Sequence, residues 1–195
     1  MSRWEPDARG RLERAALELY SERGFEQTTV AEIAARAGLT ERTFFRHFAD
    51  KREVLFRGAG SLQDFLVTTL AGTPESVAPI DAIGAAFEAV GFLLQDREYS
   101  RLRQAAIAGN AELQERELVK LATLSAALAE TLRRRGVREP AASLTAEAGI
   151  AVFRIAFERW VNDAGEPSLP QLIREALGEL RTVTAGDGAP GADRS

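Results

Sequence analysis

Hydrophobic residues recur every three or four positions along nearly the whole chain, and no segment alternates apolar and polar residues as a surface β-strand does. Beyond residue 50 this spacing predicts helices over about 51–71, 79–94, 96–108, 110–135, 140–163 and 168–183. Glycine and proline interrupt the pattern between these helices, as at Gly72, Pro74 and Gly136. The pattern therefore predicts an all-α fold.

Residues 25–56 contain two short predicted helices separated by a glycine. Thr29 and Glu32 have the spacing of a capping box, which places the start of the first helix at Thr29. Gly38 ends that helix because glycine adopts the left-handed conformation at low cost, and Thr40 caps the second helix. This arrangement is typical of a helix-turn-helix, whose second helix enters the DNA major groove.

The second of these helices has one apolar and one polar face. Phe44 and Phe48 lie one turn apart and form its inner face. Its outer face carries Arg42, Thr43, Arg46 and His47. A second capping box, Asp50 to Glu53, opens the predicted connecting helix from Lys51 to about Ala71.

This stretch and the helix before it resemble the TetR family of bacterial transcription regulators. The matching residues are Arg11, Leu12, Ala15, Ala16, Leu19, Tyr20, Gly24, Phe25, Thr28, Thr29, Val30, Ile33, Ala34, Ala37, Gly38, Leu39, Thr40, Thr43, His47, Phe48, Lys51 and Leu55. The resemblance implies a three-helix helix-turn-helix DNA-binding domain in residues 1–50 and a helical effector-binding and dimerisation domain in residues 51–183. We expect residues 184–195 to be a disordered tail, because they are polar and rich in glycine.

Position and resemblance together predict which residues contact a double-stranded DNA operator. Arg42 and Thr43 are expected to read base edges, since they lie on the outer face of the second helix. The predicted phosphate contacts, most of them at helix N-termini, are Thr29, Thr40, His47 and Lys51. Phe45 stands where the family usually has tyrosine; it keeps the ring but lacks the hydroxyl that would hydrogen-bond a phosphate. The alternatives are ordinary solvated helix positions and, for His47, capping or packing.

Composition narrows the classes of function. The 195-residue chain has no cysteine, which excludes disulfides and thiolate metal sites, and its single histidine cannot build a histidine-rich one. We therefore expect no cofactor. No apolar run reaches transmembrane length and the N-terminus is too polar for a signal peptide, so a cytoplasmic protein without a membrane partner is predicted.

Charge is distributed unevenly along the chain. The net charge is −4, but the first 57 residues hold 11 Lys/Arg against 10 Asp/Glu. The basic residues in and around the predicted reading surface include Arg36, Arg42, Arg46, Lys51 and Arg52. Because the local field governs attraction to phosphate, this distribution is compatible with DNA binding and predicts a modest non-specific affinity.

The predicted helices over 140–163 and 168–183 are apolar on more than one side. An apolar face that wide is covered from two directions, and a second copy of the chain would cover it. TetR-like proteins dimerise through their last two helices. The pattern and the resemblance together predict a homodimer with two reading heads on one two-fold axis.

The predicted middle helices mix small and large apolar residues, with Gly84, Ala85, Ala86 and Gly91 beside Phe87, Phe92 and Leu93. This mixture predicts an apolar effector pocket, the alternative being that the glycines only permit close helix packing. The predicted lining is Phe87, Phe92, Phe153 and Phe157, with Arg103 or Arg154 for an acidic head group. These aromatic residues could instead be plain core or dimer packing. Arg154 lies inside the apolar run VFRIAF, so burial and an acidic partner are expected, either across the dimer or on a ligand.

Two classes of function remain. The first is a dimeric TetR-like regulator, expected to be a repressor, released from a palindromic operator by a small apolar or amphipathic effector. Residues 101–103, 110–113 and 116 loosely resemble C-terminal domains of actinobacterial TetR-like regulators, some of which sense acyl-coenzyme A. The second is a helical small-molecule-binding protein or enzyme with no DNA role. The sequence offers no nucleophile elbow or phosphate-binding glycine loop, so we do not expect an enzyme.

Overall fold

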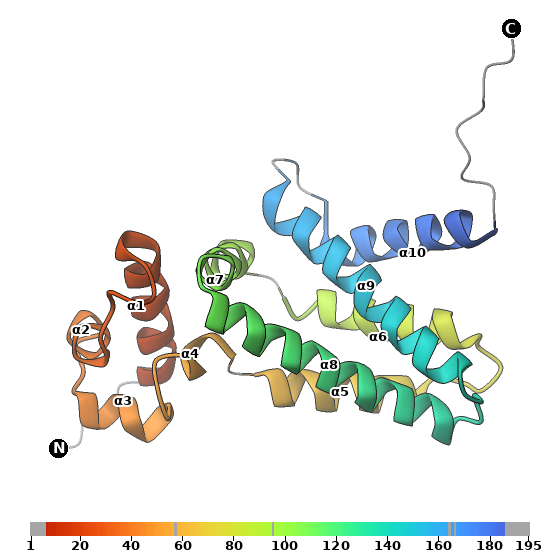
Figure 1. Ribbon diagram of the computed structural model, residues 1–195, viewed down its shortest axis with the longest axis horizontal. Coiled ribbons are helices and arrows are strands. Elements are labelled where there is room, and N and C mark those ends of the chain that lie inside the picture. The colour runs from red at the N-terminus through yellow and green to blue at the C-terminus, as the bar shows by residue number, and fades with distance from the viewer. Residues whose placement is uncertain (1–6, 57, 95, 164, 166, 186–195) are drawn as a thin grey trace, which may run out of the picture. The chain divides into compact units, whose positions relative to one another are not determined.

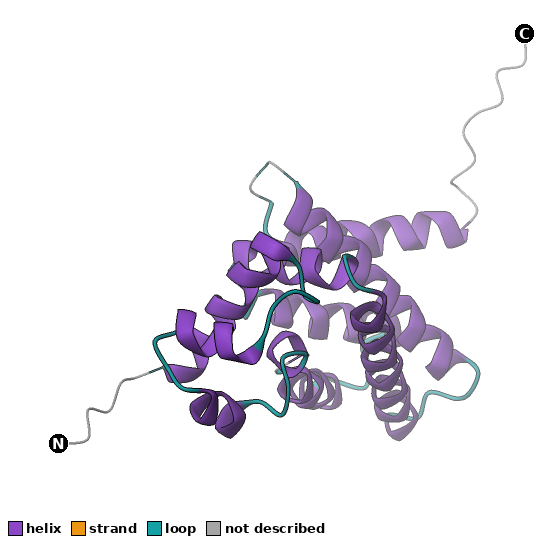
Figure 2. Cartoon of the chain, turned by 60° about the vertical axis from the view of Figure 1, so that its left-hand side comes forward, coloured by secondary structure: helices purple, strands orange, loops and turns teal. Residues whose placement is uncertain are grey.

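The computed structural model describes residues 7–56, 58–94, 96–163, 165 and 167–185, and within these ranges it contains helices and loops but no strand (Figures 1 and 2). The helices are α1 (Ala8–Arg23), α2 (Val30–Arg36), α3 (Glu41–His47), α4 (Glu53–Phe56), α5 (Ala59–Gly72), α6 (Pro79–Gly91), α7 (Arg97–Ala108), α8 (Ala111–Arg134), α9 (Ala141–Asn162) and α10 (Leu169–Ala185). This confirms the predicted all-α class. None of these described helices has the length and apolar character needed to cross a membrane.

The chain forms two compact units. The first contains residues 1–61 and 96–121, and the second contains residues 62–95 and 122–195. The domain boundary predicted at residue 50 therefore falls inside the first unit. Of the tail predicted to be disordered, residues 184 and 185 belong to α10, and the remainder lies outside the described residues.

The first unit is built around α1, which contacts α2, α3, α4 and α7. Its core includes Leu12, Ile33, Phe44 and Leu113, none of which exposes any surface. The Tyr20 hydroxyl is a polar group at the edge of this core. The Tyr20 hydroxyl donates a 2.7 Å hydrogen bond to the backbone carbonyl of residue 51, and burial, together with the nearby charge of an aspartate, raises the pKa of Tyr20. This hydrogen bond thus connects α1 to the segment that follows α3.

The single connecting helix predicted from Lys51 to Ala71 is wrong. The structure has a one-turn helix, α4, that ends at Phe56, and a separate helix, α5, that begins at Ala59. Gly58 lies between them with a φ of 84°, a conformation that a right-handed helix cannot include. The apolar spacing continued across this glycine, so the pattern alone did not reveal the break.

In the second unit α6, α9 and α10 pack against one another at glycines. A Cβ atom added to Gly84 would lie 2.7 Å from a Leu177 methyl, and one added to Gly149 would lie 2.3 Å from an Ile83 methyl. A Cβ on Gly91 would lie 2.9 Å from the ring of proline 170. The glycines predicted to shape a pocket in α6 therefore lie where helices approach closely, which favours the packing alternative.

Arg135 fastens the end of α8 to the end of α5 within the second unit. Its guanidinium donates hydrogen bonds of 2.6 Å to the carbonyls of Leu70 and Thr73, and one of 3.0 Å to the carbonyl of Pro74. These carbonyls belong to the last turn of α5 and the loop after it. The guanidinium of Arg135 thus caps the C-terminal end of a neighbouring helix.

Candidate nucleic-acid interface

The predicted helix-turn-helix is present as α2, a glycine turn and α3. The capping box at the start of α2 is complete, with the Glu32 amide donating to the Thr29 hydroxyl at 3.3 Å and the Thr29 amide donating to the Glu32 carboxylate at 2.9 Å. Gly38 forms the turn with a φ of 66°. Arg11 of α1 donates to the carbonyl of Ala37, so the end of α2 is held from below by a residue that also belongs to the family pattern. The local signals in the sequence therefore placed this motif correctly.

Helix α3 presents its polar face to solvent. Phe44 is fully buried, whereas the next residue, Phe45, exposes 55% of its surface. Arg42 and Arg46 are exposed, and neither has an ion pair within the ranges that the structure describes. The outer face of α3 thus combines two available guanidinium groups with an exposed aromatic ring.

Thr43 in the first turn of α3 contacts Thr40, the N-cap of the same helix. The Thr40 and Thr43 hydroxyls lie 3.1 Å apart, and the Thr43 amide donates to the Thr40 hydroxyl at 3.2 Å. Thr43 and His47 are half-buried, and the His47 ring lies 6.5 Å from the ring of Phe48. The Thr43 hydroxyl is therefore already in contact with the N-cap of its own helix.

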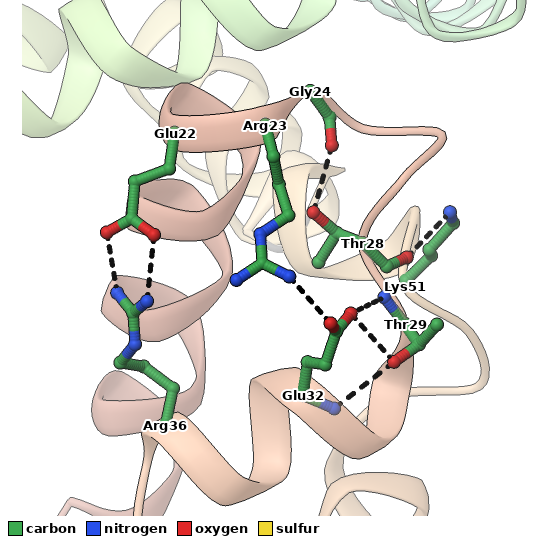
Figure 3. Close-up of polar contacts among 8 residues, drawn as sticks. All are labelled: Glu22, Arg23, Gly24, Thr28, Thr29, Glu32, Arg36 and Lys51. Atoms are coloured by element: carbon green, nitrogen blue, oxygen red, sulfur yellow. Dashed lines mark hydrogen bonds and ion pairs between the residues drawn. The ribbon is translucent and has the colours of Figure 1, made fainter.

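Thr29, a predicted phosphate contact, is already engaged at the N-terminus of α2. Its hydroxyl donates to the Glu32 carboxylate at 2.9 Å, and Arg23 donates to the other oxygen of that carboxylate at 2.6 Å (Figure 3). The backbone and hydroxyl hydrogen bonds from Thr29 hold the pKa of Glu32 below its usual range, with the charge of Arg23 adding to the effect. An incoming phosphate at this position would have to compete with a carboxylate.

Several basic residues of the predicted reading surface are paired within the first unit. Arg36 forms a two-pronged ion pair with Glu22, with both nitrogen–oxygen distances at 2.8 Å, and a longer one with Glu18. Arg52 pairs with Asp50 at 2.9 Å and with a glutamate of α8. Hydrogen bonding to Glu22 raises the pKa of Arg36. The charge left for DNA on this surface is therefore smaller than a count of residues suggests.

Lys51, another predicted phosphate contact, lies against backbone carbonyls. Its Nζ is 2.8 Å from the carbonyl oxygen of Phe25, 3.3 Å from that of Glu26 and 2.9 Å from that of Thr28. The same Nζ lies 4.3 Å from the centre of the Phe25 ring. Nothing in the sequence indicated this arrangement, because carbonyl positions depend on the course of the loop.

The predicted effector residues are only partly brought together. Phe87 of α6 is buried and its ring stacks on Phe153 of α9 at 4.9 Å, and the Phe157 ring follows at 5.8 Å. Phe92, by contrast, exposes 65% of its surface. Three rings of the predicted set thus form one aromatic row in the second unit.

The two arginines predicted for a head group differ in their surroundings. Arg103 lies in the first unit, where it donates to the Leu55 carbonyl at 2.6 Å and pairs with Glu117 at 2.8 Å. The predicted burial of Arg154 is wrong for the single chain, because its side chain is exposed and makes no ion pair among the described residues. Its neighbours in sequence are apolar, but it lies on the outward side of α9.

Comparisons with known proteins identify the family. The model described as bacterial regulatory proteins of the tetR family matches residues 13–57, and the model described as the MftR C-terminal domain matches residues 77–185. Among solved structures, the SmeT–triclosan complex has a TM-score of 0.66 at 22% identity and covers 96% of this chain and 97% of that one. SmeT is the repressor of a multidrug efflux pump of Stenotrophomonas maltophilia. FadR of Thermus thermophilus with lauroyl-CoA has a TM-score of 0.55 at 22% identity and covers 96% of this chain and 98% of that one.

Curated relatives match less than half of the chain. The HTH-type transcriptional regulator TcmR of Streptomyces glaucescens is 39% identical over 90 residues, which are 46% of this chain and 40% of TcmR. An HTH-type transcriptional repressor of Mycobacterium tuberculosis is 36% identical over 80 residues, 41% of this chain and 40% of that protein. The match thus spans about two fifths of the length of these relatives. With the helix-turn-helix in place and family models matching both the N-terminal segment and more than half of the chain, the protein belongs to the TetR family of transcription regulators.

Proposed function

We propose that the protein is a dimeric transcriptional repressor that binds a palindromic DNA operator through α3 and leaves it when a small apolar or amphipathic effector binds. The observation that carries the DNA role is the outer face of α3, where Arg42, Phe45 and Arg46 are exposed on a helix fixed by the buried Phe44. Arg42 and Thr43 read base edges, and His47 and Thr40 contact phosphate. The relative from M. tuberculosis that is named a transcriptional repressor supports repression, as opposed to activation, of the target genes.

The homodimer is supported by the outward side of α9. Leu144 exposes 66% and Ile155 exposes 51% of its surface, and both lie on one face of the helix together with the half-buried Ala148 and Ala151. An apolar stripe of this kind along a long helix fits the same stripe of a second copy. The two reading heads of such a dimer would lie one helical turn of DNA apart, roughly 34–36 Å.

An apolar or amphipathic effector is supported by the aromatic row of α6 and α9. Two proteins of the same fold were solved with such ligands, SmeT with triclosan and FadR with lauroyl-CoA, whose acyl chain is apolar. Phe153 and Phe157 are the proposed effector contacts, since they are only half-buried, whereas Phe87 supports them from below. The effector contacts of Phe92 and Arg103 stay predictions. Arg154 is available either to an acidic effector group or to an acidic residue of the second copy. To shift the protein from mostly bound to mostly free, an effector must prefer the DNA-incompetent form by about 5.5 kcal/mol.

The experiment that tests the function starts from sheared genomic DNA of the source organism. Fragments retained by the immobilised protein are eluted with salt and sequenced, and a shared inverted repeat is expected. The Arg42→Ala, Thr43→Ala double variant is the matched control and should enrich no common sequence. Apolar and acyl-type compounds are then screened for release of the repeat. Retention of no fragment by the wild type would favour the alternative, a small-molecule-binding protein without a DNA role.

A further inference from the structure

Each of the three N–H donors of the Lys51 ammonium group can be matched to an acceptor inside the protein. This group has three N–H donors and no acceptor, and three carbonyl oxygens lie 2.8, 3.3 and 2.9 Å from its nitrogen. The face of the Phe25 ring, 4.3 Å away, adds a cation–π contact. A phosphate contact by Lys51 would therefore require hydrogen bonds to be broken before a new one forms.

The three carbonyls belong to the loop that leads into α2. This loop begins at Gly24, whose φ is 86°, and the buried Thr28 donates from its hydroxyl to the Gly24 carbonyl at 2.9 Å (Figure 3). Thr29, the N-cap of α2, follows directly. By binding three carbonyls between residues 25 and 28, the ammonium of Lys51 thus fixes the loop that leads to the N-cap of α2.

The backbone of Lys51 also takes part in the packing of the first unit. Its carbonyl accepts the hydrogen bond of the buried Tyr20 hydroxyl at 2.7 Å. The preceding residue, Asp50, accepts from the amides of Arg52 at 2.8 Å and Glu53 at 3.0 Å, which fixes the start of α4. Lys51 therefore links the segment just after α3 to the segment just before α2, and so joins the two ends of the helix-turn-helix.

We propose that Lys51 is a positioning residue, whose ammonium stays on the carbonyls of Phe25, Glu26 and Thr28 when DNA is bound and holds α2 and α3 in register. The inference rests on the proposed DNA-binding function and replaces the predicted phosphate contact of this residue. The exposed arginines Arg42 and Arg46, which have no ion pair in the described ranges, supply the charge that DNA meets on α3. Lys51 then contributes to affinity but not to its salt dependence.

The direct test uses the scarcity of lysine in the chain, which has only Lys51 and Lys120. In protein labelled with ¹⁵N-lysine, the Lys51 ammonium is expected to give a slowly exchanging signal in the free protein, absent from a Lys51→Met variant. That signal should keep its position when operator DNA is added. The proposal would be overturned if the Lys51 ammonium exchanges its protons as fast as a solvent-exposed ammonium. It would also be overturned if the chemical shift changes on addition of DNA to that of a phosphate-bound ammonium. The free-protein spectrum tests the carbonyl contacts even if the wild type binds no DNA, which would instead refute the proposed function.

The salt dependence of operator binding gives the second test, at a temperature where circular dichroism shows each variant fully folded. Lys51→Met is expected to lower operator affinity about tenfold or more while the slope of log K against log salt stays at its wild-type value. Arg46→Gln is the matched control and should reduce that slope by about 0.9 for each phosphate that the guanidinium neutralises. Lys51→Arg, which keeps the charge but has planar donors, should not restore wild-type affinity. A reduced slope in Lys51→Met, or wild-type binding by Lys51→Arg, contradicts the positioning role.

Discussion

Two arginines on α3 carry charge that the rest of the first unit leaves available. Arg36 and Arg52 are bound to carboxylates, and Lys51 is bound to carbonyls, whereas Arg42 and Arg46 point outward without an ion pair in the described part of the chain. An arginine that is free of internal partners can donate two parallel hydrogen bonds to guanine. Helix α3 thus presents two arginines without ion pairs among the described residues, which favours recognition of bases over general attraction to phosphate.

Replacing Arg42 with alanine should weaken operator binding by about 1–3 kcal/mol and relax the sequence preference at one base pair of each half-site, because alanine cannot donate the two hydrogen bonds to the base. Titration of a labelled operator and of its single-base variants measures both effects. The Arg138→Ala variant removes an exposed arginine of the second unit and serves as the control. Wild-type affinity in the Arg42→Ala, Thr43→Ala double variant would exclude these residues from base reading.

The helices show which features a sequence pattern can locate and which it cannot. The caps at Thr29 and Thr40 and the glycine turn at Gly38 were predictable, because each depends on residues within one helical turn. The break at Gly58 was missed, since an apolar stripe can continue through a glycine. The contacts of Lys51 and Arg135 with distant carbonyls could not be predicted, because they depend on tertiary structure and leave no periodic trace.

The close approach of α6 and α9 leads to a prediction at Gly149. Alanine there should lower the free energy of unfolding by about 1–3 kcal/mol, although alanine is the better helix former, because its Cβ would lie 2.3 Å from the Ile83 methyl. Gly60→Ala is the matched control: no atom lies within 4 Å of its added Cβ, so it should be neutral or stabilise by up to about 1 kcal/mol. Urea unfolding measures both, and a stabilised Gly149→Ala protein would refute the close approach of the two helices.

The cap that Arg135 places on α5 can be tested in the same way. Arg135→Met keeps much of the apolar stem and removes the donors to Leu70, Thr73 and Pro74, so the free energy of unfolding should fall by about 1–3 kcal/mol. Arg134→Met removes a more exposed arginine whose ion pair with Glu130 lies on the helix surface, and it should change stability by less than about 0.5 kcal/mol. An equal decrease in the two variants would show that the cap adds no stability.

The molecule as a whole presents an apolar stripe on α9 that its own chain leaves uncovered. Leu177, by contrast, is an unsuitable site for a test of dimerisation, because it is 7% exposed and packs against Gly84 of the same chain. A charge there would disturb the interior of the second unit before it reached a partner. Ile155 is the better probe, since half of its surface is already exposed.

The Ile155→Glu variant should convert a dimer into a folded monomer and abolish operator binding at the same time, because a carboxylate would enter the apolar stripe between two copies. Light scattering gives the mass and circular dichroism the helix content. Leu118→Glu, which places the same charge on a similarly exposed leucine of α8, should stay dimeric. A wild-type monomer at micromolar concentration, or a dimeric Ile155→Glu protein, contradicts the proposed interface.

Lys51 also bears on the composition of the chain, in which only two of the 25 basic side chains are lysines. A guanidinium holds its donors in one plane, whereas the carbonyls of Phe25, Glu26 and Thr28 converge on a single point, which suits the tetrahedral donors of an ammonium. A chain that uses arginine almost everywhere thus retains lysine at a position where the shape of the cation matters more than its charge. Any redesign that exchanges lysines for arginines, whether for codon usage or to remove reactive amines, would have to leave this one in place.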